Sequence, residues 1–294
     1  MVHQKSFSPK IGTATQIFDR RQVPLPRRTV FVWITVILFG NYLLTIVKHA
    51  TPSLSLSRLL TDSVSVSLFQ YMAWFAVFRL LVRSDPKPLG DLRDFCVSIA
   101  LCLLIFLPAD KMIWVVGLGF GTYLWFCNSG DHELNAAGVV LGGLAVQAFL
   151  GPIFFNLLAA PLLSAETAVM GTILAATRTG TVWHNNIITG PDGFGIVIYS
   201  GCSSFHNLSL ALLVWLTFAK LRNPDWQRGD LARGLVIGAS MILLNWCRLY
   251  MMALNVDLYD FWHDGTGTEI FEIAAAILVL FLSLWQMKLR AGET

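Results

Sequence analysis

Charged residues are scarce in this sequence. Asp, Glu, Lys and Arg make up 13% of its 294 residues, whereas soluble domains carry about 25%. Hydrophobic residues make up 55% and the mean hydropathy is +0.62. This composition argues against an ordinary soluble protein and indicates an integral membrane protein. There is no internal repeat, low-complexity tract or linker, so we expect a single membrane domain over residues 1–294.

Several motifs that identify hydrolases or metal sites are also missing. The cysteines form no Cys-x-x-Cys pair and lack zinc-ligand spacing. No HExxH and no GxSxG occurs, so the sequence gives no motif for a zinc protease or a serine hydrolase. No metal and no cofactor is therefore implied. Four cysteines lie in apolar runs, where cysteine usually packs as a small hydrophobic residue, namely Cys96, Cys102, Cys127 and Cys247.

Long apolar runs are what the sequence does have. A helix crosses a hydrocarbon core of about 30 Å with about 20 residues. The predicted fold class is therefore all-α and polytopic, with about eight transmembrane helices, at Val30–Val47, Val64–Val82, Asp94–Leu107, Met112–Cys127, Leu134–Leu150, Phe205–Leu221, Ala232–Leu254 and Ile270–Met287. Residues 30–151 form the N-terminal helices. Residues 152–179 stay open between a ninth span, a re-entrant pair and an interfacial helix.

The net charge of +3 does not indicate nucleic-acid binding, because the basic residues lie beside the apolar runs. Most of the 21 Lys and Arg residues fall on one side of the membrane if the N-terminus is inside. We therefore expect both termini in the cytoplasm, with residues 1–29 as a cytoplasmic tail. No small-residue cleavage pattern follows the first apolar run, so this run is expected to be retained as a span.

The first candidate motif is "IYSGCSSFHNLSL", which contains Cys202. The preceding runs "VWHNNII" and "FGIVIYS", separated by "TGPDG", predict a small external β-hairpin. A helix starting near Ser203 would place Cys202 at its N-terminus, where the helix dipole lowers the pKa of a thiol. The N–H groups of Ser203 and Ser204 could then donate to an oxyanion. The alternative is a small residue where a loop meets the membrane.

The second motif is "LLNWCRLYMMAL". Arg248 lies inside an apolar run, which costs about 2.5–3.5 kcal/mol on insertion scales. Asn245 precedes it by three residues and so shares its helical face. Both side chains could therefore point into one polar cavity, while Cys247 points elsewhere and packs. The alternative is that Arg248 extends to the membrane surface as an anchor.

The third motif is "DLYDFWHDGTGTEIFEI", with His263 and Asp264 in a loop just before the last run. A lone loop histidine is commonly a solvated surface residue. However, Cys202, Arg248 and His263 come from successive segments that the predicted topology places at one membrane surface. A thiol, a base and a fixed cation are the groups that acyl transfer through a thioester requires.

With these three motifs the sequence resembles the exosortase/archaeosortase family of membrane cysteine proteases and transpeptidases. That family carries Cys-Ser-Gly at a helix start, Asn-x-x-Arg near a span end and Phe-His-Asp before another span. The matching positions here are Cys202-Ser203, Asn245 to Arg248, and Trp262-His263-Asp264. The resemblance runs from about residue 152 to the C-terminus, whereas the first half matches only as a generic bundle.

The sequence departs from the family pattern at two positions. Ser204 replaces a common glycine, and His206 stands where arginine or glutamine is usual. The sorting motif that it recognises could therefore differ from the usual Pro-Glu-Pro type. His206 is also an alternative base to His263, which the family motif favours.

The resemblance implies an enzyme of the bacterial inner membrane, with its active site facing the periplasm or exterior. It would cleave exported proteins that end in a short motif, a transmembrane helix and a basic tail. Residues 152–294 would form the catalytic half. Cys202 would be the nucleophile, His263 the base and Arg248 the oxyanion partner, with Asn245 and Asp264 orienting them. Water, or a surface glycan or lipid, would accept the acyl group.

Three other functions stay open from the residues alone. A transporter or polysaccharide-export component could use Arg248, Glu269 and Glu272 as polar groups within the membrane, although the first five spans have few charges. A membrane metalloenzyme could bind zinc through Cys202, His206 and His263. A serine protease could use Ser203 or Ser204.

Overall fold

The computed structural model describes residues 26–50, 56–87, 92–105, 111–126 and 130–291. Its elements are mostly helices, and all of them run in the order α1 Arg27–Ala50, α2 Leu56–Arg83, α3 Leu92–Ile105, α4 Met112–Phe126, α5 His132–Ala145, η2 Val146–Leu150, α6 Gly151–Thr177, β1 Val182–His184, β2 Ile187–Thr189, β3 Gly195–Val197, η3 Ser200–Cys202, α7 Ser204–Arg222, α8 Asp230–Met252, α9 Val256–His263 and α10 Thr266–Ala291.

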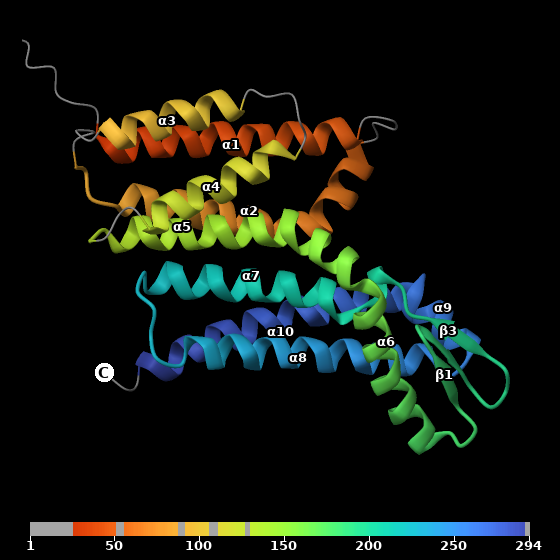
Figure 1. The fold of residues 1–294 in the computed structure, drawn as a ribbon. Coiled ribbons are helices and arrows are strands. Elements are labelled where there is room, and N and C mark those ends of the chain that lie inside the picture. The colour runs from red at the N-terminus through yellow and green to blue at the C-terminus, as the bar shows by residue number, and fades with distance from the viewer. Residues whose placement is uncertain (1–25, 51–55, 88–91, 106–110, 127–129, 292–294) are drawn as a thin grey trace, which may run out of the picture.

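The long helices lie roughly parallel in two groups (Figure 1). Helices α1 to α5 form one group and α7, α8 and α10 form the other, with α2 and α5 packed against α7. The small sheet and α9 lie together at one end of the molecule. The start of α1 and the C-terminal end of α10 lie at the opposite end.

The first group is held together by one apolar core. Phe31, Trp74 and Phe120 are among its largest fully buried side chains. Helices α4 and α5 pack closely against each other at Gly121, Gly138 and Gly142. A Cβ atom on Gly138 would lie 2.5 Å from the Gly121 carbonyl oxygen, so only glycine fits at this crossing.

Among the described residues, four helical stretches are long and apolar enough to cross a membrane, namely Arg27–Ile46, His132–Thr177, Asp230–Met252 and Thr266–Trp285. The other predicted spans coincide with α2, α3, α4 and α7, and some of these helices are short. Helix α3, for example, has 14 residues, or about 21 Å at 1.5 Å per residue. The structure therefore supports a multi-span helical protein, and the count of eight spans stays a prediction.

Residues 152–179, left open by the sequence, form most of α6. Helices α5 and α6 join through the π-helical turn η2 into a run of 46 residues, about 69 Å if straight. The run bends at η2, and α6 then crosses the bundle obliquely (Figure 1). It contains Pro161 and remains one helix, so the re-entrant pair is wrong.

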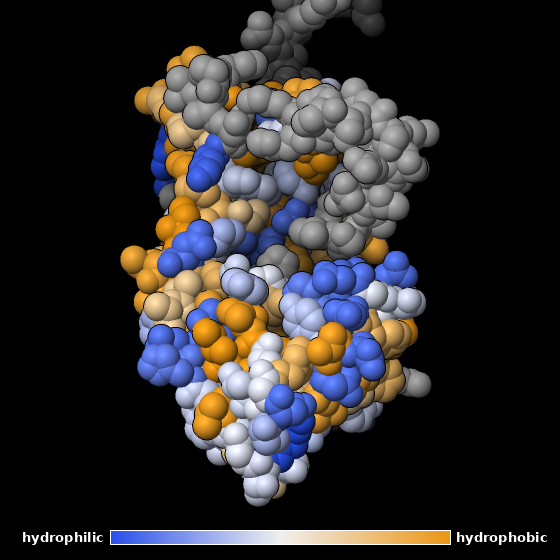
Figure 2. All heavy atoms as spheres, turned by 90° about the vertical axis from the view of Figure 1, so that its right-hand side faces the viewer, coloured by the Kyte–Doolittle hydropathy of each residue, from blue (hydrophilic) through white to orange (hydrophobic). Residues whose placement is uncertain are grey.

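The segment before Cys202 is a three-stranded antiparallel sheet of order β1-β2-β3, not a two-stranded hairpin. The predicted turn joins β2 to β3, with Ile188 opposite Ile196. A second turn splits "VWHNNII" at Asn185, whose φ is +51°, and asparagine tolerates this left-handed conformation. Figure 2 shows hydrophilic and apolar residues interspersed on this end of the molecule.

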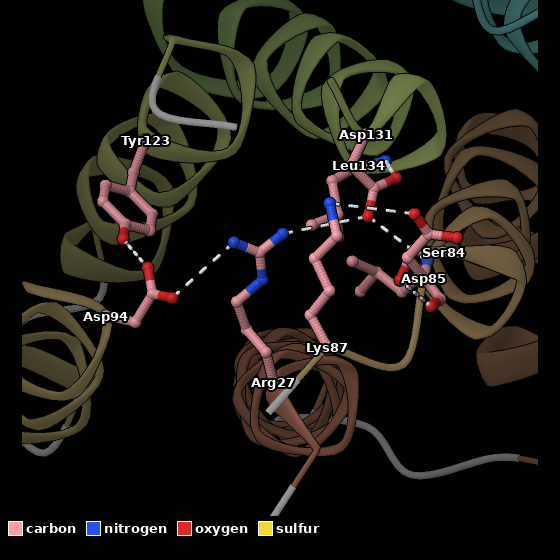
Figure 3. A network of polar contacts seen from close by, with 9 residues as sticks. Arg27, Ser84, Asp85, Lys87, Asp94, Tyr123, Asp131 and Leu134 are labelled. Atoms are coloured by element: carbon pink, nitrogen blue, oxygen red, sulfur yellow. Dashed lines mark hydrogen bonds and ion pairs between the residues drawn. The ribbon is translucent and has the colours of Figure 1, made fainter. Parts of the chain in front are cut away.

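A buried polar network lies at the opposite end (Figure 3). The Arg27 guanidinium lies between Asp94 and Asp131, with N–O distances of 3.7 and 3.8 Å. The Tyr123 hydroxyl donates to Asp94, and Asp131 accepts the Leu134 N–H at the start of α5. The ion pairs of Arg27 and the hydrogen bond of Tyr123 thus join α1, α3, α4 and the start of α5, far from the candidate site.

Candidate active site

Cys202 ends the short helix η3 immediately before α7, as the sequence predicts. Ser203 is the N-cap of α7, and its hydroxyl accepts the Phe205 N–H at 3.4 Å. The Cys202 side chain is 8% exposed and packs in a cluster with Ile198, Leu249 and Met252. The thiol therefore lies where α7, α8 and the sheet meet.

Asn245 connects α8 directly to the Cys202 segment. Its side-chain amide Nδ2 donates to the Cys202 carbonyl oxygen at 2.9 Å and to Ser204 Oγ at 3.1 Å. Asn245 is fully buried, so these bonds form away from water and are costly to lose. Its contacts are to the backbone and hydroxyl around the cysteine and not to Arg248, which the sequence analysis expected it to orient.

Glu166 of α6 was missed by the sequence analysis. It is 5% exposed, and its Oε1 accepts both the Ser204 N–H, at 3.0 Å, and the Ser204 hydroxyl. The available signal was a single acidic residue in an otherwise apolar run, "LLSAETAVMG". It went unused because the topology of residues 152–179 was open.

Two expectations about Cys202 are wrong, and Glu166 contributes to both. The N–H groups of Ser203 and Ser204 already donate to the Ser200 carbonyl and to Glu166, so they are not free oxyanion donors. The pKa of the Cys202 thiol is raised and not lowered. Burial is the main cause, Asp264 and Glu166 add to it, and Arg248 and the Tyr199 backbone oppose it.

Arg248 is half-buried and joins α8 to the end of α9. Its Nε and Nη2 both donate to the Trp262 carbonyl oxygen, at 3.0 and 2.9 Å. The guanidinium also lies 4.8 Å from the centre of the Phe271 ring, a favourable contact for a cation. These contacts hold the guanidinium plane in one orientation.

His263 ends α9, next to the residue that Arg248 holds. Its ring stacks on Tyr259 at 4.8 Å. Its Nδ1 lies 2.8 Å from Asp264 Oδ1, but without the angle of a hydrogen bond, so this is a charge contact only if His263 is protonated. The side chain of His206, the alternative base, lies outside the described part of the structure.

Two cavities meet at Gly201, the residue before Cys202. One has a volume of about 400 Å³ and is lined by Arg248, Phe271 and Glu272. The other has a volume of about 650 Å³ and is lined by Gln70, Gln147, Phe155 and Phe205. Both are mainly apolar, so apolar chains could reach Gly201 from either side of α7.

Among the described residues, no three His, Cys, Asp or Glu side chains are grouped to hold a metal ion. The structure brings Cys202, Ser204 and Asn245 into one hydrogen-bonded cluster, and Ser203 caps α7 beside it. Arg248, His263 and Asp264 form a second group that lies on the same end of the bundle. The two groups are linked through α8, and charge interactions connect Cys202 with Arg248 and Asp264.

No curated protein and no solved structure matches this sequence. Residues 67–280, however, match a family described as transmembrane exosortase (Exosortase_EpsH). The match begins in α2, so the similarity includes more of the first half than the three motifs indicate. Because it spans most of the chain, the protein belongs to the transmembrane exosortase family, a family of multi-pass membrane proteins.

Proposed function

We propose that this protein is a membrane cysteine peptidase or transpeptidase that cleaves C-terminal sorting signals of exported proteins. The observation that carries the proposal is that α8 contacts both other motifs. Asn245 binds the Cys202 carbonyl, and one turn later Arg248 binds the Trp262 carbonyl beside His263. A thiol, a cation and a base are thereby held at one end of the helical bundle. The protein also belongs to the transmembrane exosortase family, which supports the same function.

The chemistry begins with proton transfer from the Cys202 thiol to His263. The sulfur then attacks the scissile carbonyl carbon, and the C=O electron pair moves onto oxygen. Two of the five N–H donors of Arg248 bind Trp262. The remaining donors stabilise the oxyanion, a role that Ser203 and Ser204 do not fill because their N–H groups have other partners.

Collapse of the tetrahedral intermediate breaks the C–N bond and leaves a Cys202 thioester. His263 returns its proton to the departing amine, which carries the substrate's transmembrane helix and basic tail. Water, or an amine or hydroxyl of a surface glycan or lipid, then cleaves the thioester. The raised thiol pKa makes the base necessary, because little thiolate is present at neutral pH without it.

This proposal places the protein in a bacterial inner membrane, with the sheet and Cys202 on the periplasmic or outer side and both termini in the cytoplasm. The two cavities beside Gly201 support a substrate that includes a transmembrane helix. Their apolar lining suits a substrate whose cleavage site lies next to such a helix.

Replacing the nucleophile tests the proposal. We expect Cys202→Ala to abolish processing of a sorting-signal protein while the enzyme still inserts, since the substitution removes the sulfur without enlarging the residue. Processing is measured as the loss of the C-terminal helix, by a mass shift on immunoblots of matched membrane fractions. The matched controls are Cys96→Ala and Cys247→Ala, whose exposed thiols lie on α3 and α8. Full processing by Cys202→Ala would refute the thiol mechanism.

A further inference from the structure

Glu166 is a buried acidic residue with no part in the mechanism above. It lies on α6, which crosses the bundle obliquely, and its carboxylate accepts hydrogen bonds from Ser204, the first residue of α7. Oε1 accepts two hydrogen bonds from Ser204, whereas Oε2 is buried and has no hydrogen-bond partner. A buried carboxylate with one bare oxygen is costly, so its position calls for an explanation.

The hydrogen bonds around Ser204 run in one direction. The Asn245 Nδ2 group can only donate, so Ser204 Oγ accepts from it and donates its own proton to Glu166. The same Nδ2 also donates to the Cys202 carbonyl. Glu166 on α6 is thus the last acceptor in a series of hydrogen bonds that runs from Asn245 on α8 through Ser204. Asn245 also binds the Cys202 carbonyl, so the Cys202 backbone is part of the same network.

Helix α7 provides an electrostatic reason for an anion at this place. Its first N–H groups have no partners within the helix, and its dipole favours negative charge at the N-terminus. Glu166 supplies that charge. The sequence analysis assigned this position to the Cys202 thiolate, but two anions at one helix start oppose each other.

We propose that Glu166 is a positioning residue of the thiol site, which fixes the first turn of α7 against α6 and places a carboxylate beside Cys202. The cysteine is then held in its neutral form until a bound substrate and the base remove its proton. The other groups that face Cys202 are Arg248 from α8, Tyr259 from α9 and Asp264 after α9, with His263 stacked on Tyr259. The inference rests on the proposed role of Cys202 as nucleophile.

The test separates the charge of Glu166 from its hydrogen bonds. Glu166→Gln keeps an oxygen that accepts from Ser204 but removes the charge. In a variant whose only cysteine is Cys202, the rate of iodoacetamide alkylation is measured from pH 6 to pH 10. Because Glu166 raises the thiol pKa, we expect Glu166→Gln to move the alkylation midpoint to lower pH. If the midpoint falls by about one pH unit, alkylation at pH values below it becomes about tenfold faster.

Ser204→Ala is the complementary change, because it removes the hydroxyl link and leaves the charge. We expect its alkylation midpoint to match that of the unaltered protein while processing falls several-fold. Glu133→Gln, a change of the same type at the other end of α5–α6, should alter neither quantity. A residue with only a packing role would affect insertion or processing but would not shift the midpoint.

An unchanged or raised midpoint in Glu166→Gln would overturn the inference. If that variant fails to insert in the membrane, Glu166→Asp tests the inference instead. Aspartate keeps the carboxylate, but its side chain is one methylene shorter, so its oxygens lie farther from Ser204. We expect it to keep the midpoint and lose processing, and full processing would overturn the positioning role. Alkylation needs no sorting substrate, so a shifted midpoint in a protein without any processing activity would count against the proposed function alone.

Discussion

Asn245 and Arg248 lie one turn apart on α8, yet each holds a different part of the site. Asn245 binds the Cys202 carbonyl, and Arg248 binds the Trp262 carbonyl. Sequence reasoning placed both on one face because their spacing of three residues requires it. It could not name their partners, since a partner's identity depends on how α8 packs against α7 and α9.

Arg248→Lys tests whether the planar guanidinium matters. Lysine keeps the charge but cannot make the paired contact of Nε and Nη2 with one carbonyl oxygen. We expect normal insertion and processing reduced about 10²–10³-fold, the usual cost of one oxyanion donor. The measurement is the initial rate of substrate processing at matched enzyme levels.

The matched control is Arg228→Lys, because Arg228 is exposed between α7 and α8. It should process substrate at the normal rate. If Arg248→Lys did so too, Arg248 would be only a membrane anchor, and the oxyanion would need another donor.

Glu166 shows where residue-level prediction failed. A lowered pKa of the Cys202 thiol was expected because only its position at a helix N-terminus was considered. In the structure, α6 places the Glu166 carboxylate at this helix start, and the thiol is buried, so its pKa is raised. Cys202 and the start of α7 are local features and were predictable. A contact between residues 166 and 204 is not local, and no periodicity in either segment encodes it.

At the scale of elements, hydropathy located most helices well because each apolar run is continuous. Three elements were harder to predict. The run "VWHNNII" was predicted as one strand, but the Asn185 turn within it separates β1 from β2. Helix α9 was not predicted, because His263 was expected in a loop and instead ends this helix. Helix α6, whose residues were left open, is a single helix of 27 residues.

Arg178 joins three of these elements. It follows α6, and its Nη1 donates to the carbonyls of Ala253 and Leu254, at 3.2 and 2.7 Å. The carbonyls at the end of a helix lack intrahelical donors, so Arg178 satisfies those after α8. Its Nη2 binds Asp192 in the β2–β3 turn at 3.1 Å. Arg178 therefore links the β2–β3 turn to the ends of both α6 and α8, in addition to the apolar contacts of the sheet.

We expect Arg178→Ala to loosen the sheet and to increase the rate of proteolytic cleavage in the β2–β3 turn several-fold at neutral pH. Desolvation acts to raise the pKa of Asp192, but the bonds from Arg178 and from two backbone N–H groups outweigh it, and the pKa is lowered. The contact is thus fully formed above the ordinary Asp pKa and is lost only as pH falls through the lowered value.

Limited proteolysis of purified protein, with the cleavage sites identified by mass spectrometry, measures this effect. The exposed Arg228→Ala provides the control and should leave cleavage unchanged. Equal cleavage rates in Arg178→Ala and the unaltered protein would show that the sheet is held without this side chain.

At the scale of the whole molecule, two polar clusters lie at opposite ends of the bundle. The Arg27 network occupies the end where α1 begins, and the Cys202 site occupies the end with the sheet (Figures 1 and 3). The loop between α7 and α8 returns to the first end. Which of the two ends faces the cytoplasm stays a prediction, based on the distribution of Lys and Arg, because basic residues beside spans stay in the cytoplasm.

Single cysteines introduced at the two ends test the orientation. In a background without native cysteines, Tyr199→Cys places a thiol beside the site, at a position that is 59% exposed. Asp225→Cys places one in the α7–α8 loop, where the side chain is 60% exposed. We expect a membrane-impermeant maleimide to label the Tyr199→Cys protein in intact spheroplasts. The Asp225→Cys protein should be labelled only after the membrane is opened, because its thiol faces the cytoplasm. The reverse pattern would place Cys202 on the cytoplasmic side, where exported substrates do not present their cleavage site, and would contradict the proposed function.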